Sequence, residues 1–188
     1  MSQLEDVLAA IDAANSADPS KENGAPAALL YGRRMSARLS AFAPEAGEDL
    51  TIAARGQHIE RFAIARSLYP MDKPGYFRWR NALKDVHQRR LIEIMTAAGF
   101  SAARAERVGQ IVRKERIRSD PEAQVLEDVA CLVFLEHYAA DFAAGRPEDT
   151  CIDILRKTWR KMSEAGQKAA LALELPAGVK TLVGKALG

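Results

Sequence analysis

Two of the three histidines in the sequence occupy positions where they could carry acid–base or ligand chemistry. His87 lies one helical turn from both Leu83 and Leu91, so helical periodicity places it on an inward face. His58 lies beside an apolar stripe that includes Ile59. Imidazole exchanges protons near neutral pH and binds metals or anions. The pair therefore predicts a polar site.

An aspartate in an apolar helix is the third candidate. Asp128 follows Val125 by three residues and precedes Leu132 by four, which predicts burial in an apolar stripe. A buried carboxylate is costly unless it is paired, hydrogen-bonded or bound to metal. Each candidate alone is explained more simply as a satisfied core residue. The three together favour a pocket, in which Asp128 orients one histidine.

Basic residues cluster locally, although the formal net charge is only +2. Most should be solvated helix faces paired with nearby glutamates. We expect Arg61, Arg80 and Lys114 to lie near the candidate site and to form an anion-binding wall. The basic residues are scattered over many helices with matching acids, which argues against nucleic-acid binding. His137 is expected at the surface.

Helices must position these residues, because helical periodicity dominates and no segment alternates with period two. The sequence predicts an all-α fold, a single compact domain of about eight helices. The helices expected to carry the candidates run over about residues 48–65, 76–98 and 121–144.

The chain of 188 residues is long enough for one domain with a sizeable core. We expect an N-terminal helix and exposed linker over residues 1–25 and the main helical domain over 26–188. The first residues do not form a signal-peptide pattern and no apolar run is long enough to span a membrane. These features, with Cys131 and Cys151 in apolar patterns, predict a cytoplasmic protein with reduced core thiols and no membrane partner.

Four segments of the chain resemble the domain-of-unknown-function family 4202. They are AARGQHIER at 53–61, YPM and GYxxWR between 69 and 80, DPExQxLED at 120–128, and KTWxKMS at 157–163. The resemblance runs from about residue 29 to the C-terminus. It implies membership of that family and no particular activity.

The order of elements is similar, more weakly, to that of HD-domain metal-dependent phosphohydrolases. In this resemblance, residues 53–59 stand where those enzymes have a segment ending in a histidine–aspartate pair. His87 takes a later histidine position, and Asp128 begins the segment that stands for their Asp-Ala-Asp-x-Leu. The resemblance implies an HD-like arrangement and phosphate-ester chemistry.

The chain departs from the HD pattern at its metal ligands. Gln57 and His58 replace the histidine and aspartate of the pair, and the first histidine would fall near Tyr31. Lys114 replaces a histidine, and Ala130 replaces one of the two final aspartates. Lysine is protonated at neutral pH, so it repels a cation and holds a phosphate. The resemblance therefore implies a metal centre that is lost or rebuilt.

The sequence thus predicts an HD-like helical domain with a pocket for a small phosphorylated or nucleotide-like anion. Hydrolysis of a phosphate ester is the first reaction to test. The expected catalytic residues are His58, His87 and Asp128, and the expected ligand-binding residues are Gln57, Arg61, Arg80, Lys114 and Glu127.

Two alternatives stay open at this point. One is a non-catalytic interaction or scaffold domain, whose inward polar residues only satisfy one another. The other is a remodelled hydrolase in which His58, His87 and Asp128 hold a divalent metal, with open positions for water. The substitutions by Gln57 and Lys114 make us prefer anion binding over the metal centre.

Overall fold

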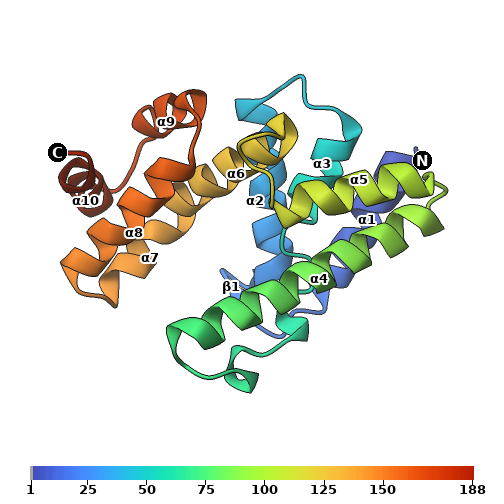
Figure 1. Cartoon of the computed structure of the whole chain (residues 1–188), viewed down its shortest axis with the longest axis horizontal. Coiled ribbons are helices and arrows are strands. Elements are labelled where there is room, and N and C mark those ends of the chain that lie inside the picture. The colour runs from blue at the N-terminus through green and yellow to red at the C-terminus, as the bar shows by residue number, and fades with distance from the viewer. Residues whose placement is uncertain (1) are drawn as a thin grey trace. The chain divides into compact units, whose positions relative to one another are not determined.

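Helices make up most of the chain in the computed structural model, which describes residues 2–188 (Figure 1). These residues form ten α-helices, two short 3-10 helices, one π-helical turn and a hairpin of two-residue strands. The predicted all-α class is confirmed, with slightly more helices than the eight expected.

The chain divides into two compact units, Met1–Arg116 and Ile117–Gly188. The first unit contains α1 (Gln3–Ser16), β1 (Lys21–Glu22), β2 (Ala25–Pro26), α2 (Ala27–Phe42), α3 (Glu48–Arg55), η1 (Arg61–Ala63), η2 (Arg66–Leu68), α4 (Lys73–Ala97) and α5 (Ala102–Arg113). The second unit contains α6 (Pro121–Val133), the π-helical turn η3 (Phe134–Tyr138), α7 (Ala139–Ala144), α8 (Glu148–Lys161), α9 (Glu164–Leu171) and α10 (Ala177–Leu187).

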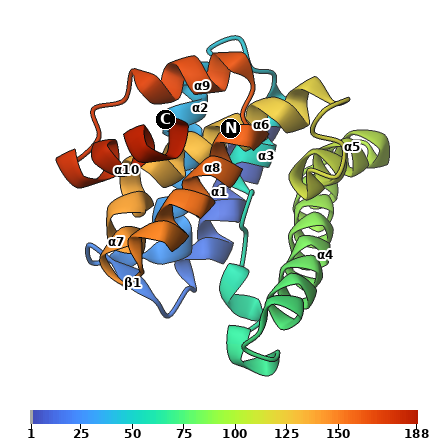
Figure 2. The same ribbon diagram turned by 60° about the vertical axis from the view of Figure 1, so that its left-hand side comes forward.

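The core of the first unit forms where α1, α2 and α5 pack on the short helix α3. Helix α4 lies along α5, which also packs on α3 (Figure 2). Helix α1 packs on α2, α3 and α4, so it belongs to this unit. Its inward residue Ile11 is fully buried, as are Met35 of α2, Ile52 of α3, Leu91 of α4 and Ile111 of α5. Burial of these apolar side chains holds the helices together.

The segment expected as an exposed linker, residues 15–25, is mostly exposed but is anchored by buried polar groups. Asp18 is buried, and its carboxylate accepts hydrogen bonds from the backbone amides of Ser20 and Ala28, both at 2.9 Å. The second bond satisfies a free amide in the first turn of α2. Strands β1 and β2 pair antiparallel between these two contacts.

The second unit begins at the helix start that the sequence predicts. The side chain of Asp120 accepts hydrogen bonds from the amides of Glu122 and Ala123, and Pro121 occupies the first turn. Helix α6 continues through the π-helical turn into α7, so the predicted long helix over 121–144 contains one such turn. Helix α8 packs on α6 and α10, and α9 packs on α6.

Both cysteines, Cys131 and Cys151, are buried, as the sequence predicts, and among residues 2–188 they form no disulfide. Among the helices of the described residues, none has the length and apolar character needed to cross a membrane.

Helix α3 ends earlier than the sequence predicts. The expected helix to about Ala65 stops at Arg55, and Gly56 is its C-terminal cap. Glycine is a weak helix former, and at this position a larger residue has no room. A Cβ on Gly56 would lie 2.4 Å from Cδ2 of Leu91, which is itself fully buried. The packing against Leu91 therefore requires glycine at the position where the helix ends.

Replacing Gly56 with alanine should destabilise the protein by about 1–3 kcal/mol, because Leu91 cannot move aside in a closely packed core. Urea unfolding followed by circular dichroism would measure this loss. Gly178→Ala is the matched control, because a Cβ at Gly178 meets no atom within 4 Å. Equal stability of the two variants would contradict the packing argument.

Candidate functional site

His58 lies in the turn after α3 and not on a helix, which corrects the predicted helical position. Glu60, in the same turn, adopts a left-handed conformation with φ of 51°. Its backbone amide donates to Oδ1 of the buried Asn15 at 2.9 Å, and its carboxylate accepts from Nε of Arg90 at 2.8 Å. Helices α1 and α4 thus hold this turn from two sides, which offsets the cost of the strained backbone.

Helix α4 presents His87 to the same turn. His87 is buried, as the periodicity predicts, and its Nδ1 lies 2.6 Å from the carbonyl oxygen of Ile59. A carbonyl oxygen only accepts, so Nδ1 carries the proton and Nε2 keeps its lone pair. The hydrogen bond therefore selects one neutral tautomer of His87 and leaves Nε2 as a base or acceptor.

Three rings form a row in this unit. The half-buried ring of His58 stacks on Tyr31 of α2, with centroids 4.6 Å apart and an interplanar angle of 16°. The rings of His58 and His87 lie 5.7 Å apart at 39°. The structure therefore brings the two predicted histidines together, beside Tyr31.

Both imidazoles are poor bases in this setting. Desolvation is the main cause that lowers the pKa of His87 to about 4, and Arg61 and Lys114 lower it further, against the hydrogen bond to Ile59, which raises it. Desolvation also lowers the pKa of His58 well below 6.5, and the charges of Arg61, Lys114 and Arg80 act in the same direction. Both rings are neutral at pH 7.

The charges of Arg61 and Lys114 lower the pKa of both histidines, and the charge of Arg80 lowers that of His58. The guanidinium of Arg61 is half-buried and lies 4.7 Å from the ring centroid of Trp79. Desolvation lowers the pKa of Arg61, although it stays charged at pH 7. Among residues 2–188, no carboxylate forms an ion pair with Arg61 or Arg80.

Lys84 is a further cation that the sequence reasoning missed. It is half-buried on α4, one turn after Arg80. Desolvation lowers the pKa of Lys84, as do the charges of Arg80, Arg113 and Lys114. The available signal was the spacing of Arg80, Lys84 and His87, which places all three on one face of α4. We call His58, Arg61, Arg80, Lys84, His87 and Lys114 the histidine–cation cluster.

Gln57, a predicted ligand-binding residue, precedes His58 in the turn. Its side chain is 3% exposed. Among residues 2–188, nothing donates a hydrogen bond to its Oε1. A buried acceptor without a donor is uncommon and costs free energy.

Asp128 lies in the second unit, where its carboxylate accepts three hydrogen bonds. It accepts hydrogen bonds from the backbone amide of Ser163 at 2.8 Å, from the Ser163 hydroxyl, and from Nε2 of Gln124 at 3.1 Å. Ser163 caps α9, and a Cβ on Gly166 would lie 2.6 Å from Asp128 Oδ1. Asp128 therefore joins α6 to the start of α9, which explains its burial.

The neighbouring Glu127 also belongs to the second unit. Its buried side chain lies 3.6 Å from Nζ of Lys161, an ion pair between α6 and α8. The printed contacts of Glu127 and Asp128 thus lie within the second unit, whereas His58 and His87 belong to the first.

The charge of the cluster suits an anion better than a cation. Within each unit, the described residues 2–188 contain no group of three or more His, Cys, Asp or Glu side chains placed to hold a metal ion. The two imidazoles are surrounded by positive groups, which repel a divalent cation and attract phosphate.

The fold and the cluster define an all-α protein with a basic site built on two neutral histidines. The chain belongs to the family described as domain of unknown function (DUF4202), whose model matches residues 5–183. This match confirms the resemblance found in the four sequence segments, and it extends to the N-terminal helix. No curated protein and no solved structure matches the chain significantly. The similarity to HD-domain phosphohydrolases stays a prediction.

His87→Asn should weaken the dependence of stability on pH, because asparagine keeps an N–H near the position of Nδ1 but does not titrate. The pKa of His87 is about 4 in the folded protein and about 6.5 when unfolded. Its contribution is therefore complete above pH 6.5 and is lost as the pH falls toward 4. Between these values the wild type should lose on the order of 3 kcal/mol more than the variant.

Urea unfolding at several pH values measures this difference. His137→Asn is the control, because His137 is exposed, as the sequence predicts. Parallel pH profiles for the wild type and His87→Asn would show that the ring is not desolvated.

Asp128→Ala should lower the free energy of unfolding by about 2–4 kcal/mol, since it strands the donors of Ser163 and Gln124. Asp153→Ala removes an exposed carboxylate paired with Lys157 and should leave the melting temperature unchanged. Differential scanning calorimetry compares the two. A wild-type melting temperature for Asp128→Ala would argue against the structural role.

Proposed function

We propose that the first unit binds a small phosphorylated anion through the histidine–cation cluster. The observation that carries the proposal is the half-buried guanidinium of Arg61. It is desolvated beside Arg80, Lys114 and two imidazoles, and no carboxylate among residues 2–188 pairs with it.

Electrostatics favours an anionic ligand for this cluster. Cations that share a desolvated region repel one another, and the pKa values of Arg61 and Lys84 are both lowered by the charge of Arg80 as well as by desolvation. A phosphate group would replace this repulsion by charge-assisted hydrogen bonds. The planar guanidinium donates two parallel bonds to phosphate oxygens, and lysine adds a point charge.

The histidines give the site acid–base groups as well as donors. At pH 7 the neutral His87 offers Nε2 as an acceptor, because Nδ1 donates to Ile59. A bound phosphate dianion would raise the pKa of His58 and His87 toward ordinary values, since an opposite charge favours the protonated ring. The ligand would thereby convert weak bases into groups that can transfer a proton.

Hydrolysis of a phosphate ester is the reaction that we infer first for this site. Its support is the order of elements, which is similar to that of HD-domain phosphohydrolases, together with the two adjacent histidines. We also propose a cytoplasmic location, supported by the buried Cys131 and Cys151, which form no disulfide among residues 2–188.

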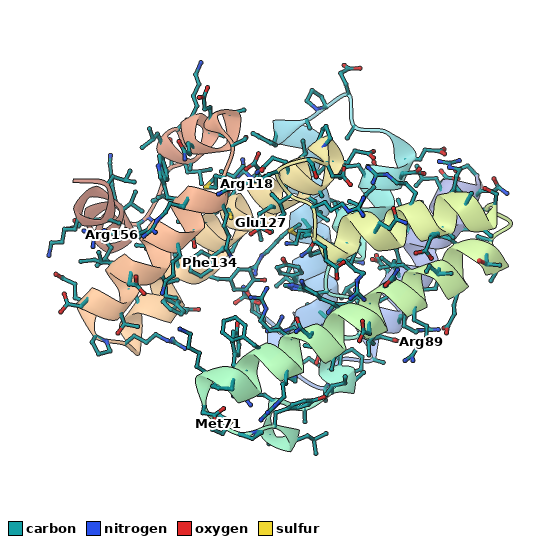
Figure 3. The ribbon with its side chains drawn as sticks, viewed as in Figure 1. Met71, Arg89, Arg118, Glu127, Phe134 and Arg156 are labelled. Carbon is teal, nitrogen blue, oxygen red and sulfur yellow. The ribbon has the colours of Figure 1, made fainter. Side chains whose placement is uncertain are left out.

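Arg61→Ala should weaken the binding of inorganic phosphate or pyrophosphate at least about tenfold, because it removes a charge-assisted, desolvated contact. Isothermal titration calorimetry at low salt measures the affinity. Arg89→Ala is the matched control, because it also removes one arginine charge. Arg89 lies on α4, is exposed and points outward (Figure 3). Its affinity should stay within about twofold of the wild type.

Absence of binding by the wild type at millimolar phosphate would remove the proposal, and so would equal losses in the two variants. The wild-type protein is then assayed for release of phosphate from a panel of phosphate monoesters, with and without Mg²⁺ or Mn²⁺. Release that His87→Asn abolishes assigns catalysis to the cluster. Binding without release assigns it a binding function alone.

A further inference from the structure

A short stretch of the first unit exposes several large apolar side chains. Leu68 and Met71 are 74% and 81% exposed, and Phe77 is 49% exposed. Single exposed apolar residues are ordinary. However, four of the six highly exposed large apolar residues among residues 2–188 lie within 68–77, with Tyr76 as the fourth. We call Leu68, Met71, Tyr76 and Phe77 the apolar platform.

Hydrogen bonds brace the loop between η2 and α4, which carries Met71 of the platform. The guanidinium of Arg66 donates to the carbonyl oxygens of Tyr69 at 2.9 Å and Pro70 at 2.7 Å. The side chain of Asp72 caps α4 by accepting from the amide of Gly75 at 2.6 Å. Gly75 lies so close to Pro70 that a Cβ would be 2.1 Å from the Pro70 oxygen. The loop therefore closes on the start of α4, and Met71 points outward from it (Figure 3).

A rigid, exposed apolar surface is suited to binding a partner, because little ordering entropy is lost when the complex forms. Its composition is that of protein interfaces, which are enriched in aromatic residues, methionine and arginine. Arg66 and Arg80 lie within 6.0 Å and 5.8 Å of the Tyr76 ring centroid. The apolar residues are thus interleaved with arginines.

Positive charge surrounds the platform. Asp72 is the one acidic residue between positions 61 and 84, and its carboxylate caps α4. Lys73 and Arg78 are exposed at the start of the same helix. Among residues 2–188, no carboxylate forms an ion pair with Lys73, Arg78 or Arg80. Charge complementarity therefore favours an acidic partner.

We propose that the apolar platform is the docking site for an acidic, apolar segment of a partner protein. Apolar side chains of that segment cover Leu68, Met71 and Phe77, and its carboxylates pair with Lys73 and Arg78. This interaction goes beyond anion binding and does not depend on it.

A phage-displayed library of random peptides, selected against the full chain, tests the proposal. Selected peptides should combine an excess of Asp and Glu with Leu, Phe or Trp. For a synthetic copy of the strongest peptide, Leu68→Ser/Met71→Ser should lower the affinity at least about tenfold in fluorescence anisotropy. Leu171→Ser/Leu187→Ser removes two apolar side chains of similar size from exposed sites of the second unit and should change the affinity less than about twofold.

Three results would overturn the docking site: selected peptides without an acidic excess, equal binding to both double variants, or no selected peptide. Two others would assign the platform differently. Platform-dependent sedimentation with vesicles of phosphatidylcholine and phosphatidylserine would indicate a membrane, and a platform-dependent dimer in ultracentrifugation would indicate a second copy. Inorganic phosphate should bind Leu68→Ser/Met71→Ser normally, which separates this proposal from that for the cluster.

Discussion

The hydrogen bond from His87 to the carbonyl oxygen of Ile59 links helix α4 to the turn that carries His58. This one contact fixes the tautomer of His87, the path of the backbone after α3, and the approach of the two imidazole rings. The turn itself would be unfavourable in isolation, because Glu60 has a left-handed backbone. Two hydrogen bonds hold it in place: the Glu60 amide donates to Asn15, and Arg90 donates to the Glu60 carboxylate. The cluster is therefore a product of tertiary packing.

The same packing keeps positive charge and neutral imidazole together. Burial desolvates Arg61, and no carboxylate among residues 2–188 forms an ion pair with it. The cation–π contact with Trp79 offsets only part of the desolvation cost. Proteins usually retain such uncompensated desolvation where it serves a function. The anionic ligand proposed above would relieve part of this cost, because opposite charges attract.

Sequence reasoning succeeded where local rules decide the structure. Helical periodicity predicted the burial of His87 and Asp128, and capping rules predicted the helix start at Asp120. Local patterns did not predict features that depend on residues far apart in the sequence. The helix before His58 ends at Gly56, where the packing of Leu91 leaves no room for a side chain, and no local pattern reveals that contact.

The partners of Asp128 show the same limit. Ser163, which satisfies its carboxylate, lies 35 residues away in the sequence. The periodicity of α6 predicted that Asp128 is buried. It could not predict whether the carboxylate would have a structural role or a catalytic one. Lys84 was missed for another reason: the sequence shows an ordinary surface lysine, and only the helix face that it shares with Arg80 and His87 indicates its setting.

The closure of Gly75 onto Pro70 has an evolutionary consequence. The backbone of this loop depends on Arg66, Asp72 and Gly75, none of which contributes a side chain to the exposed apolar surface. The scaffold and the recognition surface are thus encoded by different residues. Relatives that keep these three can exchange the side chains at 68, 71 and 77 without refolding the loop, so binding preference can diverge while the fold stays constant.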